Sequence, residues 1–178
     1  MYRLGHLVDG EWTAHSHPPV FNVVKGRIVA GVAGSDPAIF GRLVECLEPP
    51  YFLLYVLHTP RGEALPGRYQ SPALSLNQVK KFLARFAPFL TADARFDLWV
   101  HAPEDNATVV WDRHNQIFGY GPLERYSSTL EGMGFNRGRP EVPVPHEHHY
   151  HSELDPLAKE VLSAFDWTRS PLRPEDEQ

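Results

Sequence analysis

The chain has 178 residues, of which 42% are hydrophobic and 22% charged, and these values are typical of one folded domain rather than a disordered chain. The formal net charge of −5 argues against nucleic acid and anionic membranes as partners, because both are bound by concentrated lysine and arginine. Cys46 is the single cysteine and cannot form an internal disulfide, and residues 1–10 contain no apolar leader segment. We therefore expect a cytoplasmic protein.

Short apolar segments separated by glycine and proline fill residues 1–34. The Asp9-Gly10 pair between the first two segments is a strong signal for a hairpin turn. This region is therefore predicted to be an N-terminal antiparallel meander of short strands.

A helix over residues 37–47 is predicted next, because Asp36 can cap its first turn and Pro37 suits its first position. Pro49 and Pro50 end this helix. The uninterrupted apolar run 51–57 that follows has the length and aromatic content of a buried central strand.

Residues 59–72 contain three prolines and two glycines and are predicted to be a long surface connection that covers a sheet edge. The same segment offers a possible binding site for a carboxylate or phosphate, because arginine forks bind such groups. The candidate residues there are Arg61, Arg68 and Tyr69.

The clearest helix spans residues 75–90, where Ser75 and Gln78 match a capping box and apolar residues recur at helical spacing. Pro88 is expected to kink or end it.

From residue 96 the apolar period changes to two, which predicts a three-stranded antiparallel meander over residues 96–120. Further helices are predicted over 122–133 and 156–166, the second with Asp155 as N-cap. Residues 170–178 are polar and acidic and are expected to fray.

Strands and helices that do not alternate, joined by hairpins, favour an α+β fold. We expect residues 1–169 to form one domain with a mainly antiparallel sheet and about four helices largely on one face.

Residues 146–151 hold four of the ten histidines of the chain. In an extended segment His146 and His148 point to one side, and His149 and His151 point to the other. One ion such as zinc can therefore take about two ligands from this run.

Further ligands for a metal ion would have to come from distant residues or from Glu147 within the run, and the distant candidates are His101, Asp112 and His114. The chain lacks the spacing of zinc proteases and the cysteine pairs of structural zinc sites. The alternative is that the run is a solvated surface segment leading into the last helix.

A second group of polar and aromatic residues lies at the turn 111–116. Asp112 or His114 could act as a catalytic base, and Trp111 could line a ligand site. The alternative is a polar turn flanked by sheet aromatics.

Three functions remain open. The first is a protein-binding, inhibitory or regulatory module, favoured by the lack of a catalytic motif and by aromatic residues of the kind found at interfaces. The aromatic residues expected to be exposed are Trp12, Tyr69, Trp111, Tyr120, Tyr150 and Trp167.

The second function is that of a metal-dependent hydrolase, with His114, His146 and His148 as ligands and Asp112 or Glu147 as base. The third is a pH-sensitive binder of a small ligand, acting through His149 or His151.

Overall fold

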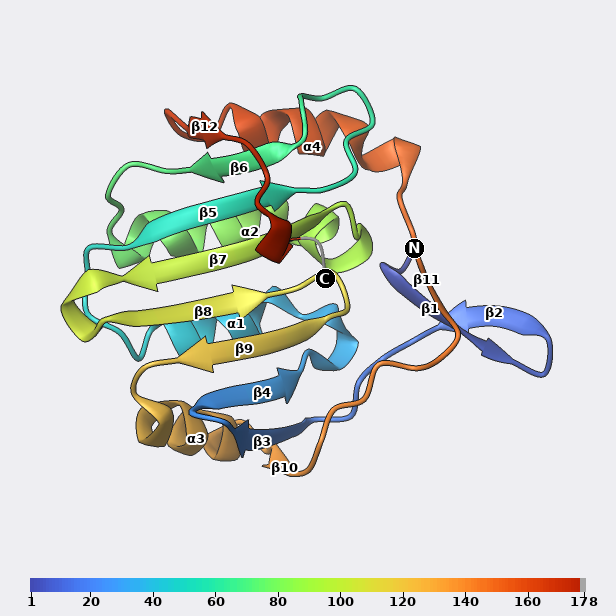
Figure 1. Ribbon diagram of the computed structural model, residues 1–178, viewed down its shortest axis with the longest axis horizontal. Helices are drawn as coiled ribbons and strands as arrows, with labels where there is room; N and C mark the ends of the chain where they lie inside the picture. The colour runs from blue at the N-terminus through green and yellow to red at the C-terminus, as the bar shows by residue number, and fades with distance from the viewer. Residues whose placement is uncertain (177–178) are drawn as a thin grey trace.

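Two β-sheets of unequal size organise residues 1–176, the part of the chain that the computed structural model describes (Figure 1). Within these residues the chain forms twelve strands and four α-helices, and most strand pairs are antiparallel. The predicted α+β class is therefore confirmed.

The large sheet has nine strands in the order β10-β3-β4-β9-β8-β7-β5-β6-β12. Its strands are β3 (Val20–Val24), β4 (Arg27–Gly31), β5 (Phe52–Leu57), β6 (Gly67–Gln70), β7 (Phe96–Ala102), β8 (Ala107–Trp111), β9 (Gln116–Tyr120), β10 (Asn136–Arg137) and β12 (Thr168–Ser170). Only the β10–β3 pair among the described strands is parallel. The predicted meander over 96–120 is confirmed as β7, β8 and β9.

The helices lie close to their predicted ranges. They are α1 (Pro37–Val44), α2 (Leu76–Ala92), α3 (Leu123–Gly132) and α4 (Asp155–Leu162), and four short 3-10 turns are Ala33–Ser35, Pro103–Asp105, Ser152–Leu154 and Pro174–Asp176. Asp36 caps α1, and the capping box of Ser75 and Gln78 is present at α2. Pro88 lies inside α2, which continues to Ala92, so the helix does not end at this residue.

One face of the large sheet is covered by helices and the other is nearly bare. In Figure 1, α1 and α2 lie behind the sheet, while among the described residues the segment that follows β12, up to Asp176, crosses the front. The alternation along β7 agrees with this arrangement, because Phe96, Leu98 and Val100 are buried and Asp97 and Trp99 are partly exposed. The front face is thus available to form a site.

The small sheet projects from one side of the large sheet (Figure 1). It contains β11 (His146–His148), β1 (Leu4–Val8) and β2 (Glu11–Ala14), in that order. Asp9 and Gly10 both have positive φ, as a tight hairpin turn requires, so the predicted hairpin is confirmed.

The prediction of one N-terminal meander is wrong, because β1–β2 and β3–β4 belong to different sheets. Pro18 and Pro19 lie between the two hairpins. Since proline cannot donate a hydrogen bond to a neighbouring strand, the chain leaves one sheet there before it enters the other.

The long connection 59–72 also contains more structure than expected, because Gly67–Gln70 forms β6 and pairs with β5. Residues 67–70 of this connection therefore form a strand of the sheet, and do not cover a sheet edge as predicted.

The C-terminal segment, which the sequence predicts to fray over residues 170–178, contacts the sheet in the part that the structure describes. Thr168–Ser170 pairs with β6, and the buried carboxylate of Asp176 lies 2.6 Å from Arg68. A charge-assisted contact of this kind holds the segment on the sheet. Residues 177 and 178 lie outside the described residues.

Asp155 is the first residue of α4 rather than its N-cap, because its carboxylate instead contacts Arg95 and Arg61. No helix among residues 1–176 is both long and apolar enough to cross a lipid bilayer.

Candidate metal centre

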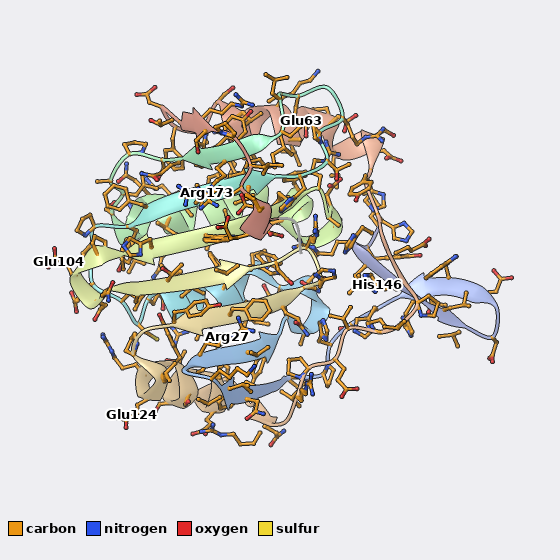
Figure 2. All side chains as sticks on the ribbon, viewed as in Figure 1. Arg27, Glu63, Glu104, Glu124, His146 and Arg173 are labelled. Atoms are coloured by element: carbon orange, nitrogen blue, oxygen red, sulfur yellow. The ribbon has the colours of Figure 1, made fainter. Side chains whose placement is uncertain are left out.

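Strand pairing sets the direction of the histidines in β11. This strand pairs with β1 so that His146 lies opposite His6 and His148 lies opposite Leu4. Because alternate residues of a strand share a face, His146 and His148 point the same way. Figure 2 labels His146 at the junction between the two sheets.

His114 meets these two histidines from the turn between β8 and β9. Its ring centroid lies 5.2 Å from that of His146 and 4.9 Å from that of His148. One ligand nitrogen from each of the three rings lies within 4.8 Å of the other two. The three side chains therefore form a group that can hold a metal ion.

Hydrogen bonds among residues 111–116 stabilise the turn that carries His114. The backbone N–H of Gln116 donates to Asp112 Oδ1 over 2.8 Å, and the indole N–H of Trp111 donates to Asn115 Oδ1 over 3.0 Å. Asn115 has a φ of 64°, a left-handed conformation that asparagine tolerates better than most residues. This local geometry directs the His114 ring toward β11.

Two of the three rings have one nitrogen already occupied. His114 Nδ1 lies 3.1 Å from Asp112 Oδ2, and His146 Nδ1 donates to the Pro143 carbonyl oxygen over 2.9 Å. A protonated Nδ1 leaves Nε2 as the nitrogen with a free lone pair. Partners of this kind orient the histidine ligands of metal sites.

His148 has no such partner among residues 1–176, where its Nε2 is buried without a hydrogen bond. An unpaired buried polar atom costs about 1–3 kcal/mol, so it calls for an explanation. Burial, followed by the nearby His114 and Arg113, lowers the pKa of His148 to about 3. The ring is neutral near pH 7 and can donate its lone pair to a metal.

The positive charge beneath the turn belongs to Arg3, which is fully buried. It donates to the carbonyl oxygen of Asp112 over 3.2 Å and stacks on the ring of Trp111. Burial lowers its pKa to about 10, so it stays charged at neutral pH. Arg3 therefore supports the turn. Its charged guanidinium group cannot serve as a metal ligand.

The other predicted metal ligands lie elsewhere. His149 Nε2 contacts Glu147 Oε1 over 2.7 Å, and His151 Nε2 donates to the Tyr2 carbonyl oxygen over 3.0 Å. His101 contacts Thr108 at the far end of β7. The structure does not bring these three histidines to the group of His114, His146 and His148.

Both predicted catalytic bases, Asp112 and Glu147, already contact a histidine side chain. Asp112 holds the ring of His114 and the turn, as described above. Glu147 pairs with His149 and alternates with His146 and His148 along β11, so it faces the opposite side of the small sheet. Glu147 therefore lies on the face of β11 opposite to the three-histidine group.

Of the predicted ligand-binding residues, two are buried. Trp111 has no exposed surface, and the hydroxyl of Tyr69 donates to the Leu65 carbonyl oxygen. Both side chains are therefore packed inside the fold and expose little or no surface. Arg61 contacts Asp155 and Arg68 contacts Asp176, so both guanidinium groups already have acidic partners.

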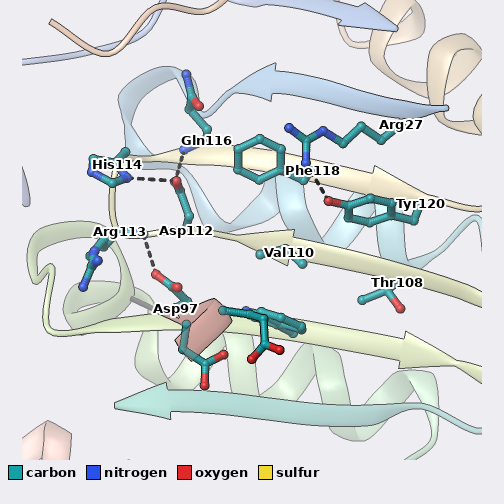
Figure 3. Close-up of a pocket in the computed structure, with 13 residues that line it drawn as sticks. Arg27, Asp97, Thr108, Val110, Asp112, Arg113, His114, Gln116, Phe118 and Tyr120 are labelled. Atoms are coloured by element: carbon teal, nitrogen blue, oxygen red, sulfur yellow. Dashed lines mark hydrogen bonds and ion pairs between the residues drawn. The ribbon is translucent and has the colours of Figure 1, made fainter. Parts of the chain in front are cut away.

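A pocket of about 510 Å³ lies on the bare face of the large sheet, next to the three-histidine group. Figure 3 shows His114 and Asp112 at one end and Arg27 at the other, with Phe118 between them. Arg27 stacks on Phe118 and donates to the hydroxyl of Tyr120 over 2.8 Å. The pocket thus combines an aromatic floor with polar ends, as ligand sites do.

Three further histidines come close to this site and were missed by the sequence reasoning. His17 Nε2 donates to the His114 carbonyl oxygen over 2.9 Å, His15 lies beside His17, and His6 lies beside His15. The His15-Ser16-His17 spacing repeats that of His146 and His148, and this signal could have drawn attention to it.

No family model, curated protein or solved structure matches this chain. The functional argument therefore depends on the geometry of the site.

Proposed function

We propose that this protein binds a divalent transition-metal ion through His114, His146 and His148 and uses it to activate water for hydrolysis. The observation that supports this function is the approach of one nitrogen from each of three imidazole rings to within 4.8 Å of the others. In one of these rings, that of His148, the buried Nε2 has no partner among the described residues. Zinc is the best match, since it favours imidazole nitrogen and tetrahedral geometry.

The number of ligands favours a catalytic over a structural ion. Within the described residues the group has three members. Structural zinc sites take four protein ligands, whereas catalytic sites take three and leave one position for water or substrate. A tetrahedral ion with bonds of about 2.0–2.1 Å holds its ligand nitrogens about 3.3 Å apart, so any pair of rings that is more widely separated would move together on binding.

The surrounding residues have separate tasks in this proposal. Asp112 holds the protonated Nδ1 of His114, which directs Nε2 toward the ion. Since Asp112 and Glu147 both already have partners, a metal ion held by the three histidines would itself supply the activation, by lowering the pKa of a water molecule bound to it. The pocket beside His114 offers space for the molecule that is hydrolysed.

Metal binding is tested with untagged protein, by titration with Zn²⁺ and by native mass spectrometry. We expect His148→Ala to bind one zinc ion fewer than the wild type. His149→Ala is the matched control, because His149 is the next residue and faces the other side of the strand. Equal zinc content in the wild type and His148→Ala would overturn the proposal.

Hydrolysis is tested by turnover of nitrophenyl esters and phosphate esters by the zinc-loaded wild type. Activity that survives in His148→Ala would show that any turnover comes from another site. Zinc bound by the wild type without turnover of any ester would support binding and contradict hydrolysis.

A second candidate function, binding to another protein, is favoured by one observation. Leu7, Val8 and Trp12 are each more than 40% exposed on the projecting β1–β2 hairpin. Exposed apolar residues gathered on one element are typical of protein contacts. A partner recovered with the wild type and with His148→Ala, but not with a Leu7→Ser/Trp12→Ser variant, would support this function. A partner recovered equally with all three proteins would contradict it.

A further inference from the structure

The inner face of the small sheet carries more histidine than the proposed metal site uses. His6 lies opposite His146 in the β1–β11 pair, and paired residues of neighbouring strands share a face. The β1–β2 register places His6 opposite Thr13, so His15, two residues further, lies on this same side. His6 and His15 therefore point toward the large sheet, as His146 and His148 do.

His15 and His17 present two ring nitrogens at a distance that suits a metal. His15 Nε2 lies 3.4 Å from His17 Nδ1, which is long for a hydrogen bond. Two ligands of a tetrahedral ion with bonds of about 2.0–2.1 Å lie about 3.3–3.4 Å apart. The pair thus has the separation that zinc requires before any side chain moves.

The free nitrogen of His17 is set by its second hydrogen bond. His17 is 2% exposed, and its Nε2 donates to the carbonyl oxygen of His114. A neutral ring with its proton on Nε2 has its lone pair on Nδ1, the atom that faces His15. Histidine ligands of metals are oriented by backbone carbonyls in this way.

His6 supplies the nearest further imidazole. Its ring centroid lies 5.0 Å from that of His15, and its Nδ1 is buried without a hydrogen-bond partner. Like Nε2 of His148, this nitrogen is shielded from solvent and makes no hydrogen bond to any described residue.

We propose that His15 and His17 bind a second divalent transition-metal ion beside the three-histidine site. His6 becomes a third ligand only when its ring moves closer, because the ligand nitrogens of the three rings do not all lie within 4.8 Å of one another. The ligands differ from His114, His146 and His148, so this inference goes beyond the proposed function and does not require it. The hydrogen bond from His17 to His114 joins the two sites.

The ionisation of the pair agrees with this geometry. Burial, followed by His17 and His6, lowers the pKa of His15 to about 4, and burial is the main cause that lowers the pKa of His17. Both rings are therefore neutral near pH 7, which is the form that binds metal.

The test is a titration of the untagged full-length protein with Zn²⁺, followed by native mass spectrometry of the wild type and of His15→Ala, His148→Ala and His101→Ala. We expect two bound zinc ions in the wild type, one in His15→Ala and one in His148→Ala. His101→Ala is the matched control, because this exposed histidine contacts Thr108 far from both sites, and it should bind two ions.

The outcomes separate this inference from the proposed function. Loss of an ion in His148→Ala but not in His15→Ala would overturn the second site and leave the first. Loss in His15→Ala but not in His148→Ala would leave the second site and overturn the first. A wild type that binds no zinc would overturn both.

Chemical footprinting of the wild type with diethyl pyrocarbonate provides a measurement that needs no variant and so does not depend on the folding of His15→Ala. We expect zinc to protect His15 from modification while His101 reacts as before. Modification of His15 at the same rate with and without saturating zinc would overturn the second site.

Discussion

The carboxylate of Asp112 contacts the ring of His114 through one oxygen and the backbone of Gln116 through the other. Oδ2 lies 3.1 Å from His114 Nδ1, and Oδ1 accepts from the Gln116 N–H over 2.8 Å. The same side chain thus closes the β8–β9 turn and sets the orientation of the ring. This links the stability of the turn to the geometry of the proposed metal site.

Asp112→Asn should weaken zinc binding about 10- to 100-fold, the usual cost of removing a partner that orients a ligand. The amide can still accept from Gln116, so the turn is kept, but its neutral group no longer holds the His114 proton as a carboxylate does. The test is to measure the Zn²⁺ affinity of the wild type and of Asp112→Asn in competition with a chelator.

Glu147→Gln is the control for that measurement, because Glu147 is also next to a histidine but faces the other side of β11. A drop in affinity equal to that of Asp112→Asn would show that the effect comes from lost negative charge rather than from orientation of His114.

Trp111→Phe should destabilise the fold by about 1–3 kcal/mol, since it leaves the buried Asn115 Oδ1 without its indole donor. Urea denaturation measures the change in the free energy of unfolding. Trp12→Phe on the exposed hairpin should change it by less than about 0.5 kcal/mol. Similar losses in both variants would contradict a specific role for the Trp111 hydrogen bond.

Gly121→Ala should destabilise the protein by about 1–3 kcal/mol, because two independent costs meet at this residue. Gly121 has a φ of 124°, and a Cβ atom there would lie 2.6 Å from Cβ of Ala107.

The matched change for that variant is Gly132→Ala in α3, where an added Cβ meets nothing within 4 Å. We expect it to be neutral or to stabilise by up to about 1 kcal/mol. Thermal unfolding of both variants tests the pair, and a Gly121→Ala variant as stable as Gly132→Ala would contradict the tight contact.

The ion pair of Asp155 with Arg95 should make the free energy of unfolding depend on pH in the acid range. Burial opposes ionisation of Asp155, but the hydrogen bond and charge of the fully buried Arg95 outweigh it and lower the Asp155 pKa below 3.8. A lowered pKa gives stability that is present above the unfolded value and lost as pH falls through the folded value. Asp155→Asn should therefore be less stable than the wild type at pH 7, by about 1 kcal/mol.

This difference should shrink below pH 4, because the wild-type carboxylate becomes neutral there as well. Denaturation at pH 7, 5 and 3 measures it, and the other carboxylates titrate in both proteins. A difference that stays constant from pH 7 to pH 3 would contradict the role assigned to the Asp155 charge.

Local patterns in the sequence were enough to predict most elements of the large sheet and its helices. The capping box at Ser75 and Gln78 and the period-two alternation from Phe96 act over a few residues, so neighbours in the chain carry the information. The hairpin at Asp9-Gly10 belongs to the same class, because a tight turn needs residues that tolerate positive φ.

The assignment of strands to sheets and the fate of the tail could not be predicted in this way. Pairing of β1 with β11 joins residues 140 to 144 positions apart, and no local pattern specifies such a partner. The ion pair of Arg68 with Asp176, which holds the C-terminal segment on the sheet, joins residues 108 positions apart.

The sequence by itself determined which histidines exist and that His146 and His148 must share one face of an extended strand, because alternation follows from backbone geometry. Only the tertiary structure decided that His114 meets that face and that His6, His15 and His17 gather beside it. These contacts depend on how two sheets pack, and packing is set by the burial of surfaces that the whole chain contributes.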